Sequence, residues 1–244
     1  MDENRNPYLI PASIIVAGFL VAFALLYTGG VGLTDSRDFR QREDNPPPGG
    51  SGQKQPSLVR TPDSSDRILG NPDAPVQIVE FSDLECPYCK QFHVTMRQVI
   101  DEYGKDGKVA WIYRHYPIAG LHPKAEKEAR AAECAFELGG NEKFWAYIDR
   151  VFEITPSNNG LADEELPNIA EHVGLNRKAF VDCLVSGKHA SRIASDIEDA
   201  LNAGAEGTPY SVVIVGGGNF YPVGGALPFT QMKTIVDQAL AGSL

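Results

Sequence analysis

The chain has 244 residues, with 32 acidic and 22 basic side chains, which gives a net charge of −10 at neutral pH. Residues 1–65 hold seven acidic and six basic side chains, so almost all of the negative charge lies in residues 66–244. An acidic protein lacks the basic surface that nucleic-acid binding requires, which excludes nucleic acid as a partner. The length allows one or two domains.

The first segment is predicted to be a membrane anchor. Residues 9–26 carry no charge, and as a helix they would span about 27 Å, close to the hydrocarbon thickness of a bilayer. A cleaved signal peptide is the alternative, with Ala22-Phe23-Ala24 as the cleavage site, but this tripeptide lies inside the apolar run and residues 1–8 are poorly basic. We expect a short cytoplasmic N-terminus at 1–8 and an uncleaved transmembrane anchor at 9–27.

Residues 28–66 are predicted to form a flexible linker. The segment 35–66 has five prolines and the run Gly49-Gly50-Ser51-Gly52, and its only sizeable hydrophobic side chains are Phe39, Leu58 and Val59. Such a composition buries too little apolar surface to fold. A flexible coil of about thirty residues has a reach on the order of 30 Å, so the segment would tether a domain that begins at residue 67.

The most informative motif is Cys86-Pro87-Tyr88-Cys89, which follows the apolar run 76–81. The next residues place Phe92, Met96 and Val99 on one helix face. At the N-terminus of a helix, unpaired N–H groups and the helix dipole favour a thiolate at Cys86. The spacing lets Cys89 close a disulfide with Cys86, so the pair is predicted to perform thiol–disulfide exchange.

The motif allows two other interpretations. A zinc site could use Cys86, Cys89 and His93, but a tetrahedral structural site needs a fourth ligand, and no second C-x-x-C or H-x-x-x-H pattern occurs. A purely structural disulfide would close a very short loop and so stabilise little. The sequence therefore predicts no metal site and no external cofactor, only a redox-active Cys86–Cys89 disulfide.

The remaining elements follow the order of a thioredoxin-like α/β fold. Strands are expected at 76–81, 109–116, 210–215 and 219–223, and helices at 86–103 and 228–241. Between the second and third strands lie five expected helices, at 123–138, 142–153, 163–173, 177–185 and 190–203. They would form an inserted α-helical domain over about 121–204, within a domain covering 67–244.

Several motifs along residues 68–241 resemble the DsbA-like branch of the thioredoxin superfamily. They include Gly70-Asn71-Pro72-Asp73-Ala74-Pro75 and the segment from Glu80 to Cys89, followed in the family's order by Tyr113-Arg114-His115-Tyr116-Pro117, His122-Pro123-Lys124-Ala125, Cys134-Ala135-Phe136-Glu137, Phe144-Trp145 and Gly207-Thr208-Pro209. The resemblance implies an extracytoplasmic thiol–disulfide oxidoreductase.

The resemblance also implies roles for individual residues. Cys86 is the expected exposed nucleophile and Cys89 the buried resolving cysteine, while the Pro87-Tyr88 dipeptide tunes the redox potential. Glu80 matches the buried acid beneath the active site, where burial would raise its pKa and let it relay a proton; a strand-end acid facing water is the alternative. Thr208 and Pro209 match the cis-proline loop that binds substrate peptide as an added strand.

Cys134 and Cys183 lie on two expected helices, each on an apolar face. Two buried free thiols are one interpretation, because cysteine often packs as a small hydrophobe. An oxidising compartment favours a structural disulfide between them, and some DsbA-like proteins carry one there. Asp83 and Glu85 flank the nucleophile, where negative charge is expected to oppose the lowering of the Cys86 pKa.

The predicted function is the introduction of disulfides into exported proteins, at the extracytoplasmic face of the cell membrane. The expected partners are cysteine-containing exported proteins and a membrane redox partner of DsbB or VKOR type. A disulfide isomerase or reductase of the same fold is the first alternative and a metal-binding chaperone module the second. Arg37, Arg40 and Arg42 after the anchor oppose this orientation under the positive-inside rule; the redox chemistry favours it, because a cytosolic thiol pool would keep these cysteines reduced.

Overall fold

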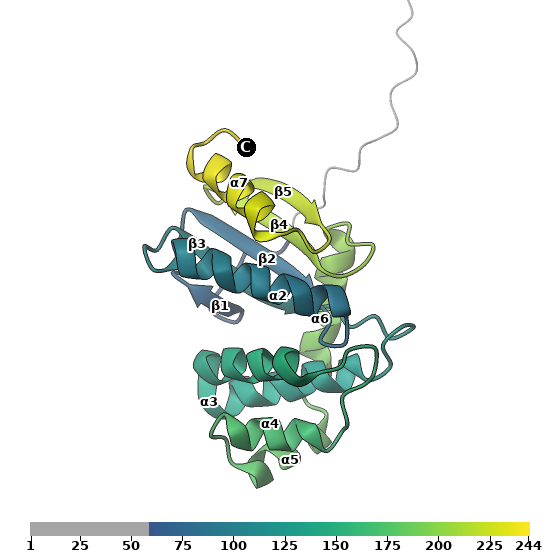
Figure 1. Cartoon of the computed structure of the whole chain (residues 1–244). Coiled ribbons are helices and arrows are strands. Elements are labelled where there is room, and N and C mark those ends of the chain that lie inside the picture. The colour runs from purple at the N-terminus through teal and green to yellow at the C-terminus, as the bar shows by residue number, and fades with distance from the viewer. Residues whose placement is uncertain (1–58) are drawn as a thin grey trace, which may run out of the picture. The chain divides into compact units, whose positions relative to one another are not determined.

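A computed structural model describes residues 59–244, which form a five-stranded mixed sheet with helices on both faces (Figure 1). The strands are β1 (Arg67–Gly70), β2 (Val76–Ser82), β3 (Val109–His115), β4 (Tyr210–Val215) and β5 (Asn219–Gly224), in the order β1-β3-β2-β4-β5. Only β2 and β3 pair in parallel, and every other neighbouring pair is antiparallel. This central β2 carries the chain into the C-x-x-C motif.

The helices are α2 (Pro87–Val99), α3 (Ala125–Ile154), α4 (Glu165–His172), α5 (Arg177–Ser186), α6 (Ala190–Asn202) and α7 (Phe229–Leu240). Helix α2 runs on into a π-helical turn, Ile100–Gly104. Helix α3 contains a break at Gly140, where φ is +71°. Glycine adopts this conformation without a Cβ penalty, and the break corresponds to the boundary between the two helices that the sequence predicts there.

Alternation along the strands separates two hydrophobic cores. In β2, Val76 and Ile78 belong to the larger core with α2, α7 and the inserted helices, whereas Val79 and Phe81 belong to the smaller core with the end of α6. Successive strand residues point to opposite faces of a sheet, so both faces of β2 are buried. In Figure 1, α2 and α7 lie side by side over one face, and α3, α4 and α5 pack together as the helical insertion.

Two features at the start of the domain differ from the sequence-based prediction. Strand β1 has only four residues and was not predicted. Residues 59–66, assigned to the flexible linker, are folded onto the domain: Val59 is buried, and the backbone N–H of Arg60 donates to Asp199 Oδ1 over 2.7 Å. The reason is electrostatic, because the fully buried Arg114 of β3 needs partners and Asp66 supplies both carboxylate oxygens, at 2.8 and 3.1 Å.

Within residues 59–244, no helix is both long and apolar enough to cross a membrane. The predicted cytoplasmic segment 1–8, the predicted anchor 9–27 and most of the predicted linker lie outside the described residues.

Helices α3 and α5 are joined by a disulfide between Cys134 and Cys183, whose Cα atoms are 5.9 Å apart. Both cysteines are buried in the larger core. The bridge therefore fixes the helical insertion internally, at a distance in sequence of 49 residues, and the predicted pairing is the one observed.

Replacing both Cys134 and Cys183 with alanine should lower the free energy of unfolding by about 4 kcal/mol, because the open chain regains the entropy of a long loop. Urea denaturation measures this loss, and thiol–disulfide exchange at Cys86 should be little changed. Thiol counting on the oxidised, denatured wild type should find no free thiol. Two free thiols in that assay would contradict the bridge.

Candidate active site

Cys86 sits at the junction between β2 and α2, where it is the N-cap residue of the helix. Pro87 occupies the first helical position, which suits proline because the N–H it lacks would be unpaired there anyway. The carbonyl of Cys86 accepts the first helical hydrogen bond, from Lys90 N–H at 3.1 Å. The nucleophile is therefore held at the positive end of the helix, as the spacing predicted.

Both cysteines of the motif are present as thiols, and both are largely buried. Cys86 is 5% exposed and Cys89 is completely buried. The prediction that Cys86 is the exposed nucleophile is therefore wrong about its exposure, because its side chain is part of the larger hydrophobic core. The exposed group of the motif is Tyr88, at 64%, beside the exposed Pro87.

The two thiols have opposite electrostatic environments. A hydrogen bond with the Cys89 thiol, helped by backbone N–H groups of Cys89 and Tyr88, lowers the pKa of Cys86 to about 6 against the opposing effect of burial. Burial, and next the hydrogen bond with Cys86, raise the pKa of Cys89 well above the usual range. At neutral pH this arrangement favours a Cys86 thiolate and a Cys89 thiol.

Glu80 lies beneath this pair, in the middle of the sheet. Its side chain is completely buried, as is that of Ile78 two residues earlier, which agrees with the prediction that both point into the same core. Burial raises the pKa of Glu80 from 4.5 to about 7, and the nearby polar groups of Ser82 and Trp111 partly offset the rise. A carboxyl that titrates near neutral pH can exchange a proton with a cysteine above it.

Sequence reasoning missed the polar groups that share this face of the sheet. Glu80 is paired in register with Tyr113 of β3 and Ser211 of β4, and both side chains are fully or almost fully buried. For Ser82 the sequence did contain a signal: residues two apart on a strand point to the same face, which puts Ser82 on the face of Glu80. The cross-strand partners could be recognised only after the register was known.

The loop before β4 closes the other side of the site. The peptide bond between Thr208 and Pro209 is cis, and Cys86 Sγ lies 3.5 Å from the Thr208 carbonyl oxygen, to which the thiol donates. A shallow pocket of about 340 Å³ opens along this loop and the adjoining ends of β4 and β5. Its lining consists of Gly204, Glu206, Gly207, Thr208, Pro209, Tyr210, Gly224 and Gly225.

Asp83 and Glu85 are both buried, and each is held by local hydrogen bonds. Neither is among the largest causes of the lowered Cys86 pKa, so their opposing effect on that thiol stays a prediction. Asp83 Oδ2 accepts hydrogen bonds from the backbone N–H of Ile118 at 2.8 Å and lies 2.9 Å from Nδ1 of His122. Asp83 Oδ1 also accepts from the backbone N–H of Glu85 at 2.8 Å, so both carboxyl oxygens have local partners.

Glu85, directly before Cys86, holds the loop between α3 and α4. Its carboxylate accepts hydrogen bonds from the backbone N–H groups of Asn159, Gly160 and Leu161. Glu128 of α3 packs against it, and burial together with hydrogen bonding to Glu85 raises the pKa of Glu128 to about 9. At neutral pH Glu128 is thus a neutral acid beside a carboxylate, a pairing that no local sequence pattern indicates.

The zinc arrangement considered for Cys86, Cys89 and His93 is not formed. His93 Nε2 lies 2.7 Å from Asp149 Oδ1, and its ring packs between Trp111 and Phe152. In the part of the chain that the structure describes, the only cluster with metal-binding spacing is Cys134, Cys183 and His189. His93 lies one helical turn beyond Cys89, but its ring contacts Asp149, Trp111 and Phe152 and does not join the two cysteines in a cluster.

A cysteine with a lowered pKa at the start of the first long helix of this fold, beside a cis-proline loop and a buried resolving cysteine, defines the thioredoxin-fold thiol–disulfide oxidoreductases. Residues 63–238 match the family described as Thioredoxin. The chain belongs to that family, in its DsbA-like branch, and is a thiol:disulfide oxidoreductase.

Solved structures with the same fold include proteins of this class. The chain is 28% identical to a thioredoxin-like oxidoreductase from Silicibacter pomeroyi, with a TM-score of 0.60 over 76% of this chain and 96% of that one. Wolbachia pipientis alpha-DsbA1 is 23% identical, with a TM-score of 0.65 over 76% of this chain and 96% of that one. Bacillus subtilis BdbD is 21% identical, with a TM-score of 0.66 over 76% of this chain and 99% of that one. At these low identities, the last two structures show only that the fold is shared.

Curated relatives are similar over a shorter region. The chain is 33% identical over 152 residues to the Na(+)/H(+) antiporter NhaA 3 of Salinispora tropica, which covers 62% of this chain and 22% of that protein. NhaA 1 of Salinispora arenicola is 31% identical over 152 residues, again 62% of this chain and 22% of that protein. The chain thus spans about a fifth of the length of these relatives, and the likeness concerns only the matched segment.

Replacing Glu80 with glutamine should make stability less sensitive to pH. In the folded protein Glu80 keeps its proton up to about pH 7, whereas an unfolded chain loses it near pH 4.5, so the wild type loses stability as pH rises through this interval. Urea unfolding should show Glu80→Gln to be more stable than the wild type at pH 8, by up to about 3 kcal/mol, with no gain at pH 4. Glu164→Gln, at an exposed acid, is the control; an equal gain at both pH values would contradict the assignment.

Proposed function

We propose that this oxidoreductase acts as an oxidase, which transfers its Cys86–Cys89 disulfide to exported proteins. The observation that carries the proposal is the lowering of the Cys86 pKa to about 6. A stabilised thiolate favours the reduced form of the pair, and therefore makes the disulfide form a stronger oxidant. The raised pKa of Cys89 does not cancel this effect, because at neutral pH Cys89 is a thiol in the reduced form.

In the proposed reaction, a client thiolate attacks Sγ of Cys86 in the disulfide. The bond between Cys86 and Cys89 breaks, and Cys89 leaves with the electron pair and takes a proton, for which Glu80 is the nearby donor. A second client thiolate then attacks the client sulfur of the mixed disulfide and releases Cys86 as a thiolate. Two electrons pass to the enzyme, the client gains one disulfide, and Glu80 regains its proton from the client thiol or solvent.

The Thr208–Pro209 loop is the proposed docking place for the client. Its backbone lies next to Cys86, and an extended peptide there can pair with exposed backbone groups as an added strand. The adjoining pocket is lined mainly by glycine and backbone, which accommodates varied side chains. The exposed Tyr88, two residues after Cys86, offers an aromatic surface to a client.

Trapping of mixed disulfides tests the order of the two cysteines. Cys89→Ser should accumulate covalent adducts with disulfide-containing client proteins, since the Cys86 thiolate can still attack a client disulfide and release one client thiolate, but no second cysteine resolves the adduct. Cys86→Ser should accumulate none. Non-reducing electrophoresis of the two variants incubated with the same clients measures the difference, and equal trapping would refute the assignment of Cys86 as the nucleophile.

The reduction potential of the Cys86–Cys89 pair tests the direction of the reaction. An oxidase should have a potential clearly above that of glutaredoxin-type proteins, roughly −200 to −230 mV. Equilibration with glutathione redox buffers, followed by alkylation and mass measurement, gives the value. A potential near that of thioredoxin, roughly −270 mV, would assign a reductase instead. Isomerase activity would show as faster rearrangement of scrambled client disulfides than oxidation of reduced ones.

The proposed setting is the outer face of the cell membrane, with the chain anchored by residues 9–27 and reoxidised by a membrane protein of DsbB or VKOR type. The disulfide between Cys134 and Cys183 supports an oxidising compartment. No external cofactor is needed, because the Cys86–Cys89 disulfide carries the two electrons.

Protease protection tests the location. Protease added to intact spheroplasts should remove the domain beyond about residue 35, while a cytoplasmic marker stays intact. The measurement is immunoblotting with an antibody against residues 67–244. If the protease cuts the domain only after lysis, the domain lies inside the cell, and this result would refute the oxidase proposal as well.

A further inference from the structure

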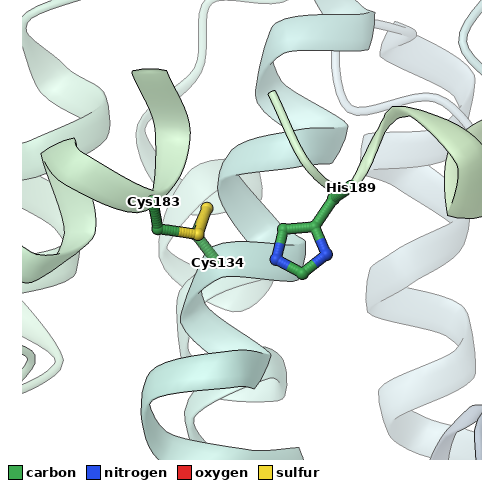
Figure 2. A group of neighbouring side chains, drawn as sticks. All are labelled: Cys134, Cys183 and His189. Carbon is green, nitrogen blue, oxygen red and sulfur yellow. A yellow bond between two sulfur atoms is a disulfide. The ribbon is translucent and has the colours of Figure 1, made fainter. Parts of the chain in front are cut away.

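The structural disulfide has a third potential metal ligand beside it. Cys134 belongs to α3, Cys183 to α5, and His189 lies in the turn between α5 and α6, where it is the N-cap residue of α6. The Sγ atoms and a ring nitrogen of His189 all lie within 4.8 Å of one another. Figure 2 shows the imidazole ring next to the bridge, with one nitrogen on the side of the sulfurs.

The environment of His189 is not explained by the disulfide alone. Nε2 of His189 is shielded from solvent and makes no hydrogen bond among the described residues. It lies 3.1 Å from Oε2 of Glu137, without hydrogen-bond alignment. Glu137 is one helical turn after Cys134 on α3 and also pairs with Lys188 at 2.5 Å. The disulfide gives the imidazole no strong polar partner, because its sulfur atoms carry no proton and little charge.

We propose that the reduced form of this bridge is a site for a zinc-class divalent cation, with Cys134, Cys183 and His189 as ligands and a water molecule in the fourth position. Two thiolates and one imidazole, with a fourth position left to water, form a donor set that Zn²⁺ accepts in tetrahedral coordination. Because 49 residues separate the two cysteines and the ligands come from three elements, no spacing motif indicates the site in the sequence.

Access to the site requires a reductant, which is a dithiol. The dithiol transfers two electrons to the Cys134–Cys183 bond and becomes a disulfide, while its two protons pass to the cysteine sulfurs. The cation then displaces these two protons when it binds the thiolates. The oxidised bridge has no thiolate and cannot bind, so the redox state decides whether the site exists.

The backbone already has the spacing that such a site needs. The Cα atoms of Cys134 and Cys183 are 5.9 Å apart, and side-chain rotation can separate the sulfurs to the distance of about 3.8 Å that two ligands of a tetrahedral zinc have. The bound cation would then link α3 to α5 in place of the disulfide. The insertion would keep its cross-link under reducing conditions, independently of the Cys86–Cys89 pair.

Cobalt binding tests the proposal, since Co²⁺ reports thiolate ligands and tetrahedral geometry by its absorption. The full chain is kept in detergent and carries Cys86→Ser and Cys89→Ser, so that Cys134 and Cys183 are its only cysteines. After anaerobic reduction with a dithiol and removal of the reductant, we expect one Co²⁺ per chain with thiolate-to-cobalt absorption, which Zn²⁺ displaces. The oxidised sample should bind none.

Replacement of the histidine separates a built site from a simple dithiol. His189→Ala should weaken Co²⁺ binding by roughly tenfold or more, while His172→Ala, at an exposed histidine at the end of α4, should leave it unchanged. Failure of the reduced protein to bind Co²⁺, with two free thiols counted, would overturn the proposal. So would equal binding by His189→Ala and the His172 control.

A melting measurement covers the case in which reduction loosens the fold. Zn²⁺ should raise the melting temperature of the reduced protein but not of the oxidised one, and His189→Ala should lose most of this increase. If Zn²⁺ leaves the reduced protein's melting temperature unchanged, the proposed site is refuted, whatever the proposed oxidase activity turns out to be.

Discussion

The contact between Cys86 and the Thr208 loop is the constraint on which the site depends. Antiparallel pairing of β2 with β4 puts Phe81 opposite Tyr210, so the loop before β4 arrives beside the residues that follow β2. Helix α2 begins there, and its N-terminus places the Cys86 sulfur 3.5 Å from the Thr208 carbonyl oxygen. The C-x-x-C spacing brings the two thiols together at the start of α2, and sheet register adds the backbone of the loop before β4.

The helical insertion is joined to this site through one carboxylate. Glu85 binds three backbone N–H groups of the loop between α3 and α4, where Ser157, Asn158 and Asn159 all have positive φ. Side chains rarely adopt this backbone conformation, and it persists only where surrounding contacts hold it. Lys90 adds a contact from α2 to the Thr155 carbonyl at 2.6 Å. A movement of the helical insertion would therefore displace Glu85, the residue directly before Cys86.

Burial gives the three titrating groups of the site their different roles. Cys86 keeps hydrogen-bond donors that favour its thiolate, whereas Cys89 and Glu80 are desolvated without enough compensation and retain their protons. One sheet face and one helix end therefore hold a thiol with a lowered pKa, a thiol with a raised pKa and a carboxyl with a raised pKa. The same core contains the Cys134–Cys183 bridge, so the catalytic and structural sulfurs share one hydrophobic environment while they lie on different helices.

The sequence by itself determined the elements and the chemistry. Short apolar runs rich in β-branched residues indicated β2, β3 and β4, and the C-x-x-C spacing after a strand indicated the helix start and the nucleophile, because both signals are local. It could not indicate β1, whose four residues carry too short a pattern, or the folding of residues 59–66, which depends on the buried Arg114 meeting Asp66. The orientation of Glu85, the cross-strand neighbours of Glu80 and the position of His189 beside the bridge were decided only by the tertiary structure. Each depends on contacts between residues far apart in the chain, which register and helix packing bring together.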